Sequence, residues 1–483
     1  MLCQKTAFHT SASRPSSRQA AEAVRLITLD PGHFHAGLIQ KEMYPGVDST
    51  VHVYAPLGPD LLAHLGRVAA FNRRAERPTS WRLEVHAGPD FLERMLREKP
   101  GNVVVLSGRN RGKMDRILAS VEAGLNVLAD KPWLIAAADF PKLEKALDVA
   151  EKKGLIAYDV MTERSEITSI LQGELARDAE VAGTVGPGSA AEPAVEMESL
   201  HHLMKVVSGA VNLRPAWFFD TEEQGEALGD VATHLVDLVP FLLFPGQAID
   251  YRSDIRLLGA KKWPTALDRA QLLRLTGEKQ LDPFLASRLT GDRLDYFANG
   301  EVSYTIRGTH IRLKALWNYE APEGGGDTHV AIVRGSRSRV EILQGAEQKW
   351  RPELYVVPNR PADAPAVKAS LKRRIVELAK SRPGLTVEEE GAAAGRDPRP
   401  LPRRPRAPLR RGDRALPRLP EGPGLPPEVG EGQHAREVLG DHEGRGDEPV
   451  AVVPEPGFVP AREGSAGVSL GWRLVDEGAL SGP

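Results

Sequence analysis

Short apolar runs alternate with stretches of helical periodicity between Val24 and Val160, and this alternation constrains the fold more than any other feature of the chain. We expect strands in the apolar runs, which are rich in β-branched residues and bounded by glycine or proline. The expected strands are Val24–Asp30, Val51–Ala55, Gly101–Gly108, Asn126–Ala129 and Leu155–Val160, and the expected helices are His35–Met43, Phe91–Glu98, Lys113–Ala123 and Ala137–Lys153. Strands and helices in this order predict an α/β domain with a doubly wound parallel sheet over residues 24–160.

The pattern changes after Met161. Strand-like runs follow one another with short connectors, which predicts a mainly antiparallel sheet and an α+β domain over residues 161–390. The strand-like runs are Ile255–Leu258, Leu294–Ile306, His310–Trp317, Thr328–Arg334 and Ser338–Leu343; Glu163–Arg177, Ala232–Phe244 and Ala366–Lys380 read as helices, Asp178–Pro193 as a loop, and Glu196–Val207 as a strand or a helix.

Residues 391–483 lack the periodicity of a folded domain. Arg399–Pro427 is crowded with proline and arginine, and such a segment buries too little apolar surface to offset its ordering entropy. One interpretation is a natural disordered tail. We favour a frameshift in a GC-rich gene, because the composition changes abruptly after Gly391 and out-of-frame GC-rich codons give Arg, Pro, Gly and Ala.

The composition excludes several classes of protein. A net charge of -2 offers no basic surface for nucleic acid. The one cysteine, Cys3, excludes an internal disulfide and fits a reducing compartment. No apolar run approaches the roughly 20 residues that span a bilayer. Residues 1–23 are polar and lack the apolar core of a secretory signal, so we expect a disordered leader and a cytoplasmic protein; a mis-assigned start that removed a signal would look the same.

Lys131 is the first candidate for chemistry. It follows the expected strand Asn126–Ala129 in the triplet Asp130-Lys131-Pro132, at the carboxyl edge where open α/β sheets bind ligands. Partial burial shifts an ammonium toward working pH, so a lysine here can donate or accept a proton. The alternative is an ordinary surface lysine at a strand end.

The first strand-to-helix turn holds Gly32, His33, His35 and Gly37, where a dinucleotide-binding fingerprint would lie. Only two of the glycines that let a backbone approach a pyrophosphate remain, and no acid follows Val51–Ala55 to bind an adenosine ribose. We therefore expect a 2′-phosphorylated cofactor, an unusual binding mode or a lost cofactor. Imidazoles that cap the turn or face a phosphate are favoured over metal ligands, and no metal site is expected.

Ser107 and Asn110 follow the strand within Gly101–Gly108, again at a carboxyl edge. Asn110 suits a bond to a nicotinamide or ribose group, or a cap on the helix that starts near Arg111, and both roles are compatible.

A second group of polar residues lies in the second domain. On a helix, Asp230 and His234 share one face while Val231, Leu235 and Leu238 lie on the buried side. An imidazole held by a carboxylate is a suitable general base for a sugar hydroxyl, and the alternative is a helix cap beside a core histidine. For an anionic or polyhydroxylated substrate we expect contacts from His202, Lys205, Arg214 and Gln224.

Together these residues resemble the Gfo/Idh/MocA family of NAD(P)-dependent oxidoreductases, the glucose-fructose oxidoreductase and inositol dehydrogenase group. The resemblance covers about residues 24–390. It lies in Asp130-Lys131-Pro132, where the family has Glu-Lys-Pro, and in Gly229-Asp230-x-x-x-His234-x-x-Asp237. Leu155–Arg164 and the His-His-x-x-Lys segment at 201–205 are similar to a subgroup with its own oxidoreductase C-terminal domain. Lys113 departs from the family, since many members have a histidine near there.

The resemblance implies a Rossmann-like dinucleotide-binding domain and NAD or NADP as cofactor. Lys131 would orient the reacting hydroxyl and the nicotinamide, His234 would accept the proton, and Asp230 would contact the substrate or His234. The Lys131–Pro132 bond would be cis, and the protein a homo-oligomer. The expected cofactor contacts are Gly32, His33, His35, Ser107, Asn110, Asp130, Lys131 and Pro132.

Three functions fit these observations. The favoured one is an oxidoreductase that transfers a hydride between nicotinamide and a sugar, a polyol or a derivative of one. A glycosidase or lyase that retains its nicotinamide and oxidises its substrate transiently is an alternative. The third is a dinucleotide-fold sensor or scaffold without catalysis.

Overall fold

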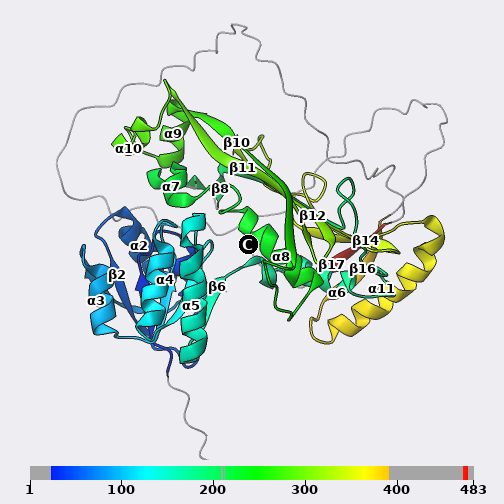
Figure 1. Cartoon of the computed structure of the whole chain (residues 1–483), viewed down its shortest axis with the longest axis horizontal. Helices are drawn as coiled ribbons and strands as arrows, with labels where there is room; N and C mark the ends of the chain where they lie inside the picture. The colour runs from blue at the N-terminus through cyan, green and yellow to red at the C-terminus, as the bar shows by residue number, and fades with distance from the viewer. Residues whose placement is uncertain (1–22, 208–209, 212, 391–470, 477–483) are drawn as a thin grey trace, which may run out of the picture. The chain divides into compact units, whose positions relative to one another are not determined.

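Six short strands in the first part of the chain form one parallel sheet in the order β3-β2-β1-β4-β5-β6 (Figure 1). The structure is a computed structural model that describes residues 23–207, 210–211, 213–390 and 471–476. The strands are β1 (Leu26–Leu29), β2 (Thr50–Ala55), β3 (Arg82–Ala87), β4 (Val103–Leu106), β5 (Asn126–Asp130) and β6 (Ala157–Val160). This is the doubly wound Rossmann order that the alternation predicted.

Helices connect the strands and cover the sheet. They are α1 (His35–Leu38), α2 (Pro59–Arg73), α3 (Phe91–Glu98), α4 (Lys113–Glu122) and α5 (Phe140–Lys153), the last preceded by the 3-10 turn η1 (Ala137–Asp139). α4 and α5 pack against each other (Figure 1). Helix α5 shows how the sequence sets an element's bounds: Pro141 lies in its first turn, and Gly154 ends it in the left-handed conformation with φ of 64°.

The strand order determines which edge of the sheet can bind a ligand. β1 pairs with both β2 and β4, so consecutive connections leave β1 in opposite directions and a crevice opens at the carboxyl ends of β1 and β4. The strands are held by buried β-branched and leucine side chains, including Ile27, Val104 and Val127, each at most 1% exposed.

A nine-stranded sheet forms the second part, in the order β10-β11-β12-β7-β13-β14-β15-β17-β16. Neighbouring strands are antiparallel except β7 and β12, which are parallel, so the mainly antiparallel α+β expectation is confirmed. The strands are β7 (Val195–Met204), β10 (Ile255–Asp268), β11 (Arg293–Ile306), β12 (Thr309–Glu320), β13 (Thr328–Arg334), β14 (Ser338–Gln344), β15 (Glu353–Pro358), β16 (Leu385–Glu390) and β17 (Gly471–Asp476); β8 (Val206–Val207) and β9 (Ala210–Val211) form a separate pair.

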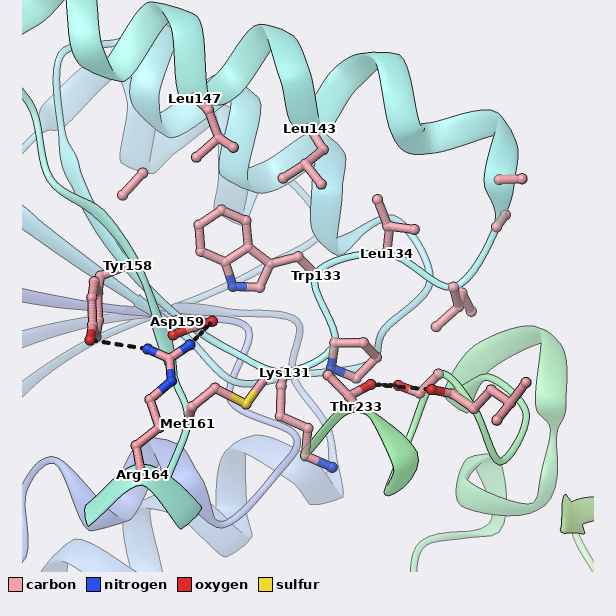
Figure 2. Close-up of a pocket in the computed structure, with 17 residues that line it drawn as sticks. Lys131, Trp133, Leu134, Leu143, Leu147, Tyr158, Asp159, Met161, Arg164 and Thr233 are labelled. Carbon is pink, nitrogen blue, oxygen red and sulfur yellow. Dashed lines mark hydrogen bonds and ion pairs between the residues drawn. The ribbon is translucent and has the colours of Figure 1, made fainter. Parts of the chain in front are cut away.

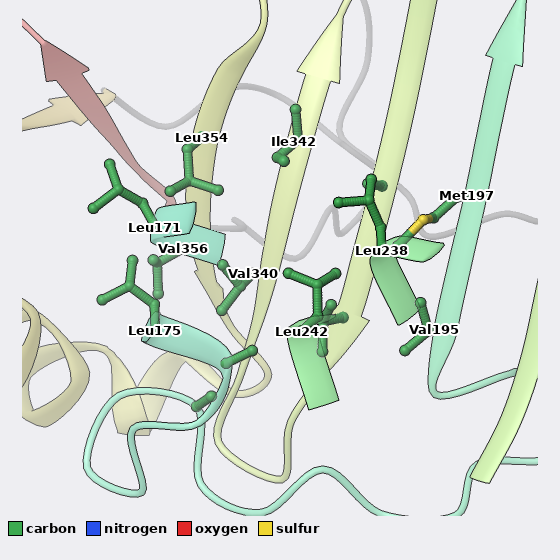
Figure 3. Packing of buried hydrophobic residues seen from close by; sticks show 14 of the residues in the cluster. Leu171, Leu175, Val195, Met197, Leu238, Leu242, Val340, Ile342, Leu354 and Val356 are labelled. Carbon is green, nitrogen blue, oxygen red and sulfur yellow. The ribbon is translucent and has the colours of Figure 1, made fainter. Parts of the chain in front are cut away.

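Among the helices that pack on this sheet are α6 (Ile167–Ala176) and α8 (Ala232–Leu243). Figure 3 shows Leu171 and Leu175 of α6, and Leu238 and Leu242 of α8, among the apolar side chains of the strands. Complete burial of each such leucine contributes about 1.5–3 kcal/mol. The other helical segments are η2 (Glu163–Ser165), η3 (Ala216–Phe219), α7 (Thr221–Gln224), α9 (Arg269–Thr276), α10 (Pro283–Ser287), η4 (Pro361–Asp363) and α11 (Ala364–Ala379).

Several local expectations differ from the structure. The helix expected over His35–Met43 ends at Leu38 and continues as single turns, in which the amides of Gln40 and Lys41 bond three residues back. The helix expected over Glu163–Arg177 is broken at Glu166, whose side chain caps α6 by accepting from the Ser169 amide at 2.9 Å. α2 and β3 were not expected.

Most of the expected leader and tail lies outside the described part of the chain, namely residues 1–22, 391–470 and 477–483. Within the tail, Gly471–Asp476 forms β17, which pairs with β15 and β16. We had expected no strand there; the sequence Gly-Trp-Arg-Leu-Val-Asp has the apolar content of one. Among the described helices, none combines the length and apolar character needed to cross a bilayer.

Candidate functional site

Lys131 and Asp230 meet where the parallel sheet adjoins the start of α8. Lys131 Nζ donates to Asp230 Oδ1 at 3.0 Å and to the Asp230 carbonyl at 3.3 Å, and both side chains are 9% exposed. Burial alone would raise the pKa of Asp230, but the Lys131 ammonium holds it below the usual value. The Lys131–Pro132 peptide bond is cis, as the resemblance implied.

Asp130, the last residue of β5, gathers both histidines of the first turn. His35 Nδ1 lies 2.7 Å from Asp130 Oδ1, His33 Nδ1 lies 3.0 Å from Asp130 Oδ2, and Ser107 Oγ donates to Oδ2 at 3.3 Å. Burial would raise the pKa of Asp130, yet its two imidazole partners hold that pKa well below the usual range. Asp130 therefore serves as an anion that orients the turn.

His234 lies on the first turn of α8 near Lys131. Burial and the Lys131 ammonium lower its pKa to about 3, so the imidazole is neutral at physiological pH. Its Nδ1 is buried without a hydrogen-bond partner among the described residues. We had expected the Asp230 carboxylate to hold this ring, but Asp230 bonds to Lys131. Asp230 also does not cap α8, whose N-cap is Val231 with no side-chain bond.

Asn110 belongs to a buried polar chain. Its amide Nδ2 donates to the Gln224 carbonyl at 2.7 Å, and its Oδ1 accepts from Lys113 Nζ at 2.6 Å. Lys113 is 1% exposed and also donates to the Asp130 carbonyl at 3.2 Å; burial lowers its pKa to about 8. The predicted helix cap is wrong, because α4 starts at Lys113 and its N-cap is Gly112.

The predicted substrate residues fall into separate groups. His202 Nδ1 lies 3.2 Å from Asp327 Oδ1, and Lys205 pairs with the same carboxylate. The Arg214 guanidinium lies over the rings of Phe218 and Trp317, at 4.5 and 5.0 Å.

Some of the charged residues in these groups affect one another's pKa values. Asp230 and Asp327 both act on the pKa of Arg214, which burial lowers. Gln224 instead lies at the contact with Asn110 described above.

The first turn packs tightly against the turn after β4. The amides of Gly32 and His33 both donate to the Ser107 carbonyl, at 2.9 and 2.7 Å. A Cβ on Gly108 would come 2.1 Å from the Asp30 carbonyl oxygen, so glycine is required there. Two amides that a conventional fingerprint offers to a pyrophosphate are thus engaged within the protein.

An open pocket of about 680 Å³ lies beside Lys131. Figure 2 shows Trp133, Leu143 and Leu147 on one side of it, and Arg164 bonded to Tyr158 and Asp159 on the other. Of the predicted site residues only Lys131 and Pro132 line it. Its apolar lining does not suit a polyhydroxylated ligand, so the polar cluster around Lys131, Asp230 and His234 is the stronger candidate for the reaction centre.

Comparison with known proteins places the chain in a family. Residues 171–393 match the family described as "Putative oxidoreductase C terminal domain". The crystal structure of a "putative oxidoreductase" from Parabacteroides merdae ATCC 43184 is 44% identical with a TM-score of 0.74, over 77% of this chain and 84% of that one. This chain belongs to the Gfo/Idh/MocA oxidoreductases.

Other solved structures match this chain at lower identity. GenD2 from gentamicin A biosynthesis, solved in complex with NAD, is 17% identical with a TM-score of 0.46, over 77% of this chain and 90% of that one. Levoglucosan dehydrogenase in complex with NADH is 13% identical with a TM-score of 0.45, over 70% and 78%. A comparison with curated proteins found no match.

Sequence reasoning about this oxidoreductase missed three polar residues near the site. Asp327 binds His201, His202 and Lys205, and Asp60 accepts from Trp217 Nε1 at 3.1 Å. Lys113 had been noted only as a departure from the family. A lysine in the first turn of α4, where the helix dipole disfavours a cation, is a signal that could have identified it, whereas no local signal marks Asp327.

Proposed function

We propose that this oxidoreductase transfers a hydride between NAD(H) or NADP(H) and a CH-OH carbon of a sugar, a polyol or a derivative of one. The observation that carries the proposal is the 3.0 Å contact between Lys131 and Asp230. It joins the carboxyl edge of a dinucleotide-type sheet to the residues that lead into α8, beside a neutral imidazole.

The residues at this edge fit a nicotinamide dinucleotide. The Rossmann strand order opens a crevice at the carboxyl ends of β1 and β4, and the His234 Nδ1 atom has no hydrogen-bond partner in the part of the chain that the structure describes. The cofactor would be held by the predicted contacts Gly32, His33, His35, Ser107, Asn110, Asp130, Lys131 and Pro132. When bound, the nicotinamide supplies the hydride acceptor or donor. Because no acid follows β2, either NAD or NADP is compatible.

Lys131 would orient the reacting hydroxyl. Its ammonium has three protons, of which two are directed to Asp230, one to the carboxylate and one to the carbonyl. The third is available to a substrate oxygen. Asp230 fixes the direction of this donor, and the positive charge stabilises an oxygen that becomes negative during the reaction.

His234 would accept the hydroxyl proton. Since its Nδ1 is buried, Nε2 is the nitrogen that can reach a substrate. A pKa of about 3 leaves the base form fully populated. The hydroxyl becomes strongly acidic as its carbon is oxidised, so even this weak base can take the proton at that stage.

Gently purified full-length protein tests the proposal. Mass spectrometry after denaturation should show NAD(H) or NADP(H), or titration calorimetry should show binding of one of them. Absorbance at the NAD(P)H band then reports turnover on a panel of sugars and polyols. Protein that neither retains nor binds either nucleotide would refute the proposal. Retained nucleotide with no net turnover would instead indicate transient oxidation, as in the alternative lyase or glycosidase. The expected homo-oligomer is checked by analytical ultracentrifugation of the same sample.

A further inference from the structure

A second cluster of potential metal ligands lies away from the site above, on strands β2 and β3. In the parallel register, His52 is the lateral partner of Glu84 and Tyr54 is the lateral partner of His86. Residues two apart on a strand point to the same face, so all four side chains share one face of the sheet. β3 is the edge strand of this sheet.

Two of the three distances between potential ligand atoms in this cluster are close to the edges of a metal polyhedron. His52 Nδ1 lies 3.3 Å from Glu84 Oε2 and 3.5 Å from His86 Nε2. Zinc bonds of about 2.0–2.1 Å give tetrahedral edges of about 3.3–3.4 Å. The three potential ligand atoms all lie within 4.8 Å of one another. An ion can therefore bind all three with little movement.

The surroundings hold the ligands in place. Tyr54 is fully buried, stacks on the His86 ring at 4.4 Å and donates its hydroxyl to Glu98 Oε2 at 2.6 Å. The nearby Arg94 cation is paired with Glu98 Oε1 at 2.8 Å, which reduces its repulsion of a metal ion. His52 is 20% exposed and Glu84 57%, so the cluster is open to solvent on one side. Water can complete the coordination.

We propose that His52, Glu84 and His86 bind a divalent transition-metal ion of the zinc class. The two imidazoles are ligands of borderline softness, which favours Zn²⁺ over Mg²⁺ or Ca²⁺ because those ions prefer oxygen ligands alone. A bound ion would tie the edge strand β3 to β2 and stabilise the sheet. This inference is independent of the proposed catalytic function, since none of its residues belongs to that site.

Calorimetric titration of the full-length protein with Zn²⁺ tests this site. Glu84→Gln and His86→Ala should each weaken the site by about tenfold or more, because each removes one of three ligands. Glu84 is exposed, so Glu84→Gln is expected to fold even if His86→Ala does not. Glu93→Gln on α3 is the matched control for loss of an exposed acid and should bind Zn²⁺ like the wild type.

The buried cluster of His33, His35 and Asp130 is the competing Zn²⁺ site, and His35→Gln distinguishes it. The proposal requires His35→Gln to leave the affinity unchanged and Zn²⁺ to raise the Tm of the wild type but not of Glu84→Gln. Anomalous diffraction from Zn²⁺-soaked crystals should give a peak between His52, Glu84 and His86. No binding by the wild type, or binding by Glu84→Gln and His86→Ala as tight as that of the wild type, would overturn it.

Discussion

Lys131 Nζ lies 3.0 Å from Asp230 Oδ1, joining two residues that are 99 positions apart in the sequence. Because both side chains are 9% exposed, neither charge is compensated by water if the other is removed. Asp230→Ala should lower the free energy of unfolding by about 3–5 kcal/mol. Asp230→Asn keeps an acceptor and should lower it by less. Urea unfolding measures both. Lys152→Ala, which removes an exposed pair with Asp148, is the control and should be almost neutral.

Activity should depend on Lys131 and His234 separately. Lys131→Met removes the donor to the substrate oxygen and His234→Gln removes the proton acceptor, so each should lower kcat by about 10²-fold or more. Steady-state NAD(P)H formation gives kcat and KM once a substrate is found. Circular dichroism checks that each variant is folded. Wild-type rates in both variants would contradict the assigned roles.

Acid should destabilise the protein through buried neutral histidines. His64 is 1% exposed, and neither of its ring nitrogens has a hydrogen-bond partner among the residues that the structure describes. Burial lowers its pKa to about 4. The unfolded chain takes up a proton near pH 6.5 while the folded chain does not. The free energy of unfolding should therefore fall as the pH drops from about 6.5 to about 4, by up to about 3 kcal/mol for this residue.

His64→Leu tests the origin of that pH dependence. Between pH 6.5 and 4, the slope of the unfolding free energy against pH should decrease by the amount that corresponds to the uptake of about one proton on unfolding. It should not vanish, because burial also lowers the pKa values of His234 and His329, to about 3 and about 4. Equal slopes in wild type and variant would show that His64 is not the source.

The turn after β1 and the turn after β4 pack closely, so the effect of an alanine substitution on thermal stability should depend on its position. Gly108→Ala places a Cβ 2.1 Å from a main-chain oxygen, so the turns must separate and the Tm should fall by several degrees. Nucleotide binding should weaken as well. Gly58→Ala is the matched control, since nothing lies within 4 Å of its Cβ and its φ of 175° is extended backbone. Equal Tm values for the two variants would argue against the packing explanation.

Local patterns predicted the framework and the position of Lys131 at the end of β5, because strand and helix periodicities depend on neighbouring residues. They missed β3, although Arg82, Glu84 and His86 alternate with Leu83, Val85 and Ala87 in the period-two pattern of a strand. The start of α2 did carry a signal, Pro59 in its first turn.

Partners of individual side chains were harder to predict. The contact between His201 and Asp327 spans 126 positions and depends on where β13 begins beside β7. Likewise, helical spacing predicted that Asp230 and His234 share one helix face, but α8 begins at Ala232, and only the tertiary structure shows that Lys131 takes the Asp230 carboxylate. A one-residue change in register would alter such contacts without changing the local pattern.

The engagement of Gly32 and His33 by the Ser107 carbonyl has a consequence for protein engineering. Cofactor preference in dinucleotide enzymes is commonly altered by editing the glycine motif and the acid after the second strand. Here those amides already serve the protein's own backbone and that acid is absent. Engineering the choice between NAD and NADP in this chain therefore has to start from other side chains near the carboxyl end of β2, where the adenosine ribose of a dinucleotide lies.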